Sequence, residues 1–115
     1  MSLEILPPDD SRRYKLVKLG GRLDAHSADE YKPQLQSLIE PGPAHLVGDL
    51  ADLKYISSAG LNLLIHICRE ARKKGGDFRL AGVQAYVKEI MDLTGYTKIF
   101  KLYDTVEQAA AAFAA

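Results

Sequence analysis

Two adjacent serines, Ser57 and Ser58, are the side chains of this sequence best placed for regulated chemistry. They stand directly before Ala59, Gly60 and Leu61, where a long amphipathic helix is predicted to begin. A serine at this position caps the helix, because the first backbone N–H groups have no partner within it. The same free N–H groups favour a phosphate, and a phosphoserine adds roughly 1.5 to 2 negative charges. The pattern therefore indicates either a structural cap or a phosphorylation switch.

Other kinds of chemistry find little support in the sequence. Ser58 and His26 can be drawn as a hydrolytic triad with Asp24 or Asp49, but the Gly-x-Ser-x-Gly turn that presents such a nucleophile is missing. The three histidines have no metal-ligand spacing with one another or with the single cysteine, Cys68. The glycine pairs lack the Lys-Ser/Thr of a phosphate-binding loop. We therefore predict no enzyme activity, no catalytic residues, no metal and no bound cofactor.

A predicted buried strand and a predicted helix position the two serines. The strand is the short apolar run 45–50, which ends in Asp-Leu. The helix is indicated by apolar residues that recur at intervals of three and four, namely Leu61, Leu64, Ile65, Cys68 and Ala71. Basic residues followed by Gly75-Gly76 mark its end. Because Cys68 belongs to the buried stripe, we interpret it as a small core residue rather than a nucleophile.

The rest of the chain alternates further predicted strands and helices. Short apolar segments predict four more strands, at 3–6, 14–19, 78–81 and 99–102, with Gly20-Gly21 ending the second of them. Three more helices are expected, one beginning with a capping box of Ser27 and Glu30, one at 84–94 and one after Thr105. Pro33 lies inside the first of these helices. Either its first turn is distorted, or the regular helix restarts with Pro33 in its first turn.

This order predicts an α/β fold with a mixed sheet of four to five strands and about four α-helices. The first two strands are expected to pair antiparallel, and the later ones to be joined by crossovers. The 115 residues are expected to form one domain, 1–115.

Charge and hydropathy exclude several classes of partner. Fifteen basic and fifteen acidic residues cancel, so the sequence shows no electrostatic footprint for nucleic acid or an anionic membrane. It also has no apolar run of membrane-spanning length and no signal-peptide pattern at its N-terminus. The single cysteine fits a reducing, cytoplasmic setting.

Three motifs together resemble a known family. They are Gly21-Arg22-Leu23-Asp24 before a helix, Asp49-Leu50, and the segment 55–61 with Ile-Ser-Ser-Ala-Gly-Leu. In this order they resemble a stand-alone STAS domain of the bacterial anti-sigma-factor antagonist family, over roughly residues 3–113. In that family the helix start usually reads Asp-Ser-Ser/Thr-Gly-Leu, and the serine after the aspartate is phosphorylated. Alignment on Gly60-Leu61 places Ser58 on the phosphoacceptor and Ser57 in place of the aspartate.

The resemblance implies a partner switch in transcription regulation. The unmodified domain would bind an anti-sigma factor that is also a serine kinase, and so free the sigma factor. Phosphorylation at Ser58 by that kinase would break the complex, and a phosphatase would restore it. With Ser57 in place of the aspartate, Ser57 becomes a second candidate acceptor, while Asp24 can contribute negative charge nearby. The alternative is a constitutive interaction or scaffold subunit of a signalling or transport assembly, with Ser58 only a cap.

The implied docking surface combines the serine loop with one face of the central helix. Its predicted residues are Asp24, Ser57, Ser58, Ala59, Gly60, Asn62, His66, Arg69 and Lys73. For the helix residues the simpler interpretation is an ordinary solvated face. We expect a monomer or a weak dimer.

Overall fold

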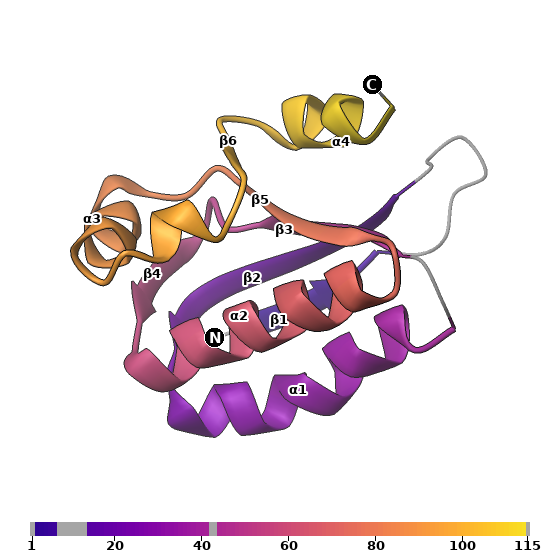
Figure 1. Ribbon diagram of the computed structural model, residues 1–115. Coiled ribbons are helices and arrows are strands. Elements are labelled where there is room, and N and C mark those ends of the chain that lie inside the picture. The colour runs from indigo at the N-terminus through magenta and orange to yellow at the C-terminus, as the bar shows by residue number, and fades with distance from the viewer. Residues whose placement is uncertain (1, 7–13, 42–43, 115) are drawn as a thin grey trace.

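The computed structural model describes residues 2–6, 14–41 and 44–114 (Figure 1). Its strands are β1 (Ser2–Ile5), β2 (Lys15–Leu23), β3 (His45–Asp49), β4 (Leu53–Ile56), β5 (Asp77–Ala81) and β6 (Leu102–Tyr103). Its helices are α1 (Ala25–Ile39), α2 (Ser58–Lys73), α3 (Ala85–Leu93), the short 3-10 helix η1 (Tyr96–Lys98) and α4 (Val106–Ala114). None of the helices in these described ranges is both long and apolar enough to cross a bilayer.

The strands form one mixed sheet. Its order is β1-β2-β3-β5-β6, and β4 pairs with the far half of β2. Among the described strands only β1 runs antiparallel to its neighbour, and the other pairs are parallel, which confirms the predicted pattern of one antiparallel pair and later crossovers. The four-residue strand β4 was not predicted from the sequence, so the prediction had one strand fewer than the six described here. The last strand is also shifted, since the prediction at 99–102 overlaps β6 only at Leu102.

Strand β2 does not end at its glycine pair, as the sequence analysis predicted. It continues to Leu23 through a register shift between Gly21 and Arg22, where Gly21 has a φ of 74°. The first half of β2 pairs with β3 and the second half with β4. The glycine therefore redirects the strand, as in a bulge, instead of stopping it.

Helix α1 begins two residues before the predicted capping box. Asp24 is its N-cap: Asp24 Oδ1 accepts from the Ser27 N–H at 3.1 Å, and Ser27 Oγ accepts from the Asp24 N–H at 2.9 Å. The predicted pair of Ser27 and Glu30 was therefore wrong. Both expectations for Pro33 were wrong too, because α1 is continuous through it. Pro33 and Asp29 are exposed, so the Asp29 carbonyl that loses its helical donor lies beside solvent.

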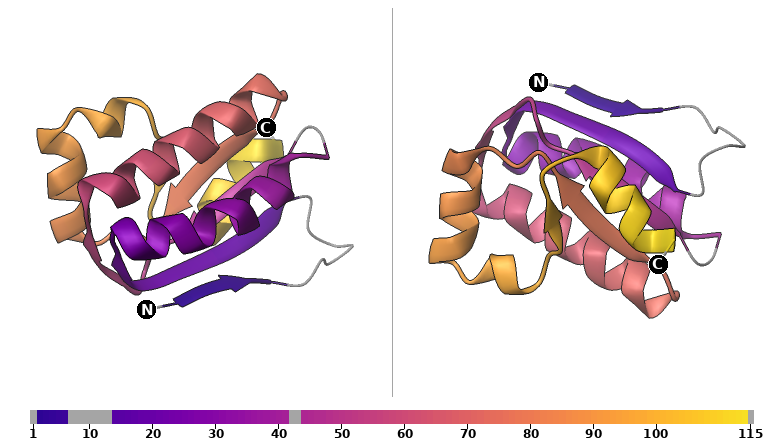
Figure 2. Two further views of the ribbon diagram at one scale, coloured as in Figure 1. Left: turned by 90° about the horizontal axis from the view of Figure 1, so that it is seen from below. Right: turned by 90° about the horizontal axis from the view of Figure 1, so that it is seen from above.

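The helices cover the two faces of the sheet unequally (Figures 1 and 2). Helices α1 and α2 lie on one face over the main core, which includes Leu64, Ile67 and Phe78. Helix α4 lies on the other face over a smaller cluster that includes Val47 and Ala109. The predicted apolar stripe of α2 is confirmed, because each of its five residues is buried.

Candidate functional site

Two helices begin side by side at one edge of the sheet. Strands β2 and β4 are parallel neighbours, and Leu23 of β2 lies opposite Ile56 of β4. Asp24, which follows Leu23, is the N-cap of α1, and Ser57, which follows Ile56, is the N-cap of α2. The Ser57 N–H donates to the Leu23 carbonyl at 2.9 Å and so fixes the two segments together. Parallel pairing thus brings the two predicted site segments to the same place.

The two serines have different surroundings. Ser57 is half-buried, and its Oγ accepts from the Gly60 N–H at 3.1 Å, so it is the cap of α2. Ser58 is the first residue of α2, and its exposed hydroxyl has no hydrogen-bond partner among the described residues. The N–H groups of Ser58 and Ala59 belong to the first turn, where no intrahelical acceptor is available.

Asp24 lies in the same hollow as the two serines. An open depression of about 640 Å³ is lined by Asp24, Ser57 and Ser58, together with residues of β4 and α3. The backbone N–H of Ser27, which hydrogen-bonds to the Asp24 carboxylate, holds its pKa below the ordinary value. Asp24 therefore places a fixed negative charge at this end of the sheet.

Helix α3 supplies part of this hollow, which the sequence analysis missed. Tyr86 and Ile90 line it, and Tyr86 is 53% exposed although it is a large aromatic residue. The sequence held no specific signal for this residue, because single exposed hydrophobic side chains are common on protein surfaces. Its place beside Ser58 depends on how α3 packs against β4, and local sequence does not encode that packing.

The remaining predicted docking residues divide into two groups. Asn62, Arg69 and Lys73 are exposed on α2, as expected. His66 is half-buried instead of solvated, because its Nε2 lies 3.0 Å from Nε2 of Gln36 on α1. Ala59, Asn62 and His66 also line a second hollow of about 330 Å³ between α1 and α2.

Gly60 is buried, so it offers no surface to a partner, and its role is to let α2 pack closely against β2. A Cβ at this residue would lie 2.5 Å from the Leu23 carbonyl oxygen, so only glycine lets the start of α2 approach β2 this closely.

The described residues show no assembled catalytic or metal centre. Within ranges 2–6, 14–41 and 44–114, no hydrogen bond joins Ser58 to His26, Asp24 or Asp49, and no group of three potential metal ligands is present. Cys68 is fully buried, and burial raises the pKa of its thiol. It is therefore a protonated core residue, as the sequence analysis predicted.

Comparison with known proteins decides the family of this fold. A family model described as the STAS domain matches residues 8–109. The chain belongs to the STAS domain family. It is 32% identical over 95 residues to BtrV of Bordetella bronchiseptica, a match that covers 83% of this chain and 82% of that protein. It is 30% identical over 105 residues to the anti-sigma F factor antagonist of Paenibacillus polymyxa, covering 90% and 89% of the two chains.

Solved structures of other STAS proteins have the same fold. SpoIIAA of Bacillus in its phosphorylated form superposes with a TM-score of 0.74 at 18% identity, covering 97% of this STAS domain and 99% of that chain. At this identity the likeness extends to the fold alone. The STAS family and its mixed α/β fold are thus confirmed.

Proposed function

We propose that this STAS domain is an anti-sigma factor antagonist that works by partner switching, with Ser58 as its phosphoacceptor. The observation that carries the proposal is that the two serine side chains differ in hydrogen bonding and in exposure. Ser57 is engaged as the cap of α2, while the Ser58 hydroxyl is exposed at the first helical position without a partner among the described residues. A kinase can reach Ser58 without breaking a bond of the fold.

Phosphorylation at Ser58 would act on the interface more than on the fold. A phosphate there lies at the positive end of a 16-residue helix, beside the first-turn N–H groups, so the folded domain tolerates it. A protein partner docked on the same surface would have to desolvate the dianion next to Asp24, which lines the same hollow. The added charge therefore opposes binding while it leaves the domain folded.

The proposed docking surface includes both hollows. Ser58 lines the hollow with Asp24 and Tyr86, and the second hollow, with Asn62 and His66, adjoins it at Ala59, which lines both. Arg69 extends the surface along α2. The partner we propose is an anti-sigma factor with serine kinase activity, opposed by a phosphatase. In this role the domain is a ligand and a kinase substrate and performs no catalysis itself.

The relatives support this proposal. The Paenibacillus polymyxa relative is named an anti-sigma F factor antagonist. SpoIIAA, which shares the fold, has been solved in both unphosphorylated and phosphorylated forms.

The decisive experiment is intact-mass analysis after incubation with candidate anti-sigma serine kinases and ATP. We expect a gain of one phosphate in the unmodified domain and in Ser57→Asn, and none in Ser58→Ala. Asparagine is the matched control, because it keeps an N-cap oxygen at residue 57 and removes the hydroxyl. If Ser58→Ala is phosphorylated and Ser57→Asn is not, the phosphoacceptor is Ser57 and the proposal for Ser58 is wrong.

A binding measurement separates the switch from a constitutive scaffold. We expect the kinase partner to bind the unmodified domain and to bind Ser58→Asp at least tenfold more weakly, a loss of about 1.4 kcal/mol. Equal affinity for the two forms, with no phosphorylation by any candidate kinase, would favour the scaffold and contradict the switch.

A further inference from the structure

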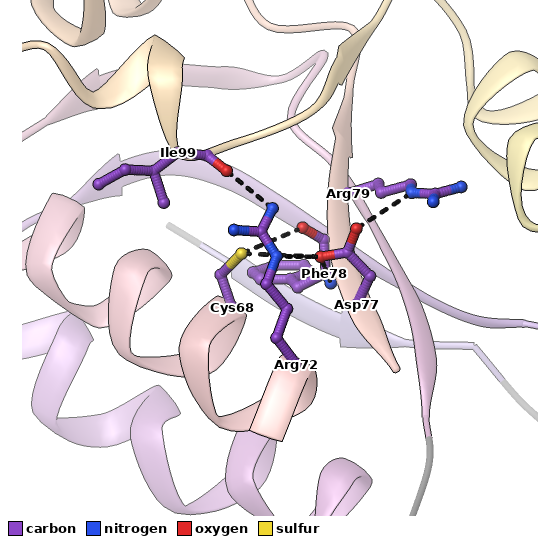
Figure 3. A network of polar contacts seen from close by, with 6 residues as sticks. All are labelled: Cys68, Arg72, Asp77, Phe78, Arg79 and Ile99. Carbon is purple, nitrogen blue, oxygen red and sulfur yellow. Dashed lines mark hydrogen bonds and ion pairs between the residues drawn. The ribbon is translucent and has the colours of Figure 1, made fainter. Parts of the chain in front are cut away.

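A cluster of charged residues at the opposite end of α2 takes no part in the proposed switch. Asp77, at the start of β5, is held between two arginines that approach it from opposite sides (Figure 3). Arg72 Nε lies 2.9 Å from its Oδ1, and Arg79 Nε lies 3.2 Å from its Oδ2. Oδ1 also accepts from the Phe78 N–H at 2.9 Å. Both oxygens of the carboxylate are therefore already engaged.

One donor of this cluster is left without an acceptor. The Arg79 side chain is only 11% exposed, and its Nη1 has no hydrogen-bond partner in the described structure. Asp77 does not bind Nη1: the donors to its oxygens are Cys68 Sγ, Arg72 Nε, the Phe78 N–H and Arg79 Nε. Nη1 is shielded from solvent, so the donor that Arg79 can offer to the adjoining hollow is its other terminal nitrogen, Nη2, which is not buried.

The cluster borders a hollow with an excess of positive charge. Its volume is about 370 Å³, its wall is mostly polar, and Arg72, Arg79 and Lys101 line it together with Asp77. These residues carry three positive charges against one negative charge. The carboxyl end of α4 also lies here and offsets roughly half a charge. A net positive hollow thus occurs in a chain whose formal net charge is zero.

Phe113 of α4 forms an aromatic part of the wall. The Arg79 guanidinium lies 4.0 Å from the centroid of the Phe113 ring, and the ring of His45 stacks on Phe113 at 4.5 Å. These contacts hold Arg79 in a fixed orientation beside the hollow. A guanidinium held in this way is prepared to bind an oxyanion with little loss of side-chain entropy.

We propose that this hollow binds a small tetrahedral oxyanion of the phosphate class. Arg79 Nη2, which is not buried and has no hydrogen bond in the described structure, would donate to one oxygen, and the charges of Lys101 and Arg72 would balance the charge of the anion. A hollow of about 370 Å³ with a mostly polar, positively charged wall has room for a free phosphate or the phosphate group of a small molecule. The proposal does not depend on phosphorylation of Ser58, which lies at the other end of α2.

The test is a titration of the ¹⁵N-labelled domain with inorganic phosphate, pyrophosphate and sulfate at constant ionic strength. We expect saturable shifts at the amides of Gly75, Gly76 and Lys101, with chloride giving none. The amides of Ser58 to Gly60 are the internal control, because a helix N-terminus also attracts anions. Saturable shifts confined to those amides, or no saturation at millimolar phosphate, would overturn the proposal.

Two variants locate the site. Lys101→Gln is expected to weaken phosphate binding about tenfold, whereas Lys98→Gln, a nearby exposed lysine outside the hollow, leaves it unchanged. Arg79→Lys keeps the charge beside Asp77 and so favours folding, but loses the planar fork and should also weaken binding. Unchanged affinity in both Lys101→Gln and Arg79→Lys would show that the anion binds elsewhere. Ser58→Ala should bind phosphate normally, so failure here leaves the proposed switch untouched.

Discussion

The two ends of helix α2 are held in different ways. At its N-terminal end one side chain, Ser57, caps the helix, and the next residue, Ser58, has a free hydroxyl among the described residues. At its C-terminal end Arg72 bonds both to Asp77 and to the Ile99 carbonyl, the latter at 2.7 Å. The C-terminal end of α2, which leads into β5, is therefore held by side-chain bonds to other elements, while the N-terminal end exposes a serine hydroxyl to solvent.

This difference separates stability from the proposed regulation. Sixteen residues at about 1.5 Å per residue place the two ends roughly 24 Å apart. Exposed charges at that distance are strongly screened at physiological salt. A phosphate on Ser58 therefore has little influence on the network at Asp77. We therefore expect substitutions at the Asp77 end to change the free energy of unfolding more than substitutions at the serine end.

Asp77→Ala should give the largest decrease in the free energy of unfolding. Removing the carboxylate leaves the Arg79 guanidinium buried without its counter-charge, beside a second cation at Arg72. Breaking a buried ion pair in this way costs about 3–5 kcal/mol. Urea unfolding of the variant, with Asp92→Ala on an exposed face of α3 as the control, measures the difference. A loss as small as that of the control would mean that the network contributes no stability.

Substitution of alanine for Gly60 or Gly76 should give the second-largest decrease in the free energy of unfolding. A Cβ at Gly76 would lie 1.9 Å from the Ala44 carbonyl oxygen, and one at Gly60 would lie 2.5 Å from the Leu23 carbonyl oxygen. Both contacts are with backbone, which cannot rotate away. We expect each substitution to cost about 1–3 kcal/mol, with Gly76→Ala the more severe. Thermal unfolding of both variants checks the order, and the reverse order would show that the serine end is the more tightly packed.

The two serines should differ in their effect on stability. Ser57→Ala removes the oxygen that accepts from Gly60, and loss of such a cap costs about 1 kcal/mol. Ser58→Ala removes an exposed hydroxyl and should change the free energy of unfolding by no more than about 0.5 kcal/mol. Chemical denaturation of the pair measures both values. Equal losses would contradict the separate roles given to the two residues.

The smallest effect concerns pH. The hydrogen bond from Ser27 lowers the pKa of Asp24 in the folded state from its ordinary value of 3.8. A lowered pKa contributes stability above the unfolded value, and that contribution is lost as the pH falls below about 4 through the folded value. The unmodified domain should therefore lose stability relative to Asp24→Asn in this window, because asparagine also caps but does not titrate. Parallel unfolding profiles of the two proteins would contradict the assignment.

Local patterns were sufficient for much of this fold. The apolar stripe of α2 and the glycine stop after it predicted the central helix, because helical periodicity and termination are encoded within a few residues. Helix α3 was predicted to within one residue at each end for the same reason. The cap of α2 was narrowed to Ser57 or Ser58, and the structure selects Ser57.

Pairings between distant segments were not predictable in this way. Strand β2 was predicted to end at Gly20-Gly21, because glycine usually weakens or breaks a strand. Gly21 instead lets β2 change partners from β3 to β4, and β4 itself is too short to recognise from four residues. The same limit hid the capping role of Asp24, which depends on where β2 ends.

The sequence by itself determined the α/β class, the amphipathic α2, the serine at its start and the motifs that resemble the STAS family. These features rest on contacts between neighbours along the chain. Only the tertiary structure decided that Asp24 and Ser57 begin their helices side by side, that Tyr86 borders Ser58, and that Asp77 gathers Arg72 and Arg79. The physical reason is that strand register and helix packing are set by the burial of the whole core, to which every element contributes.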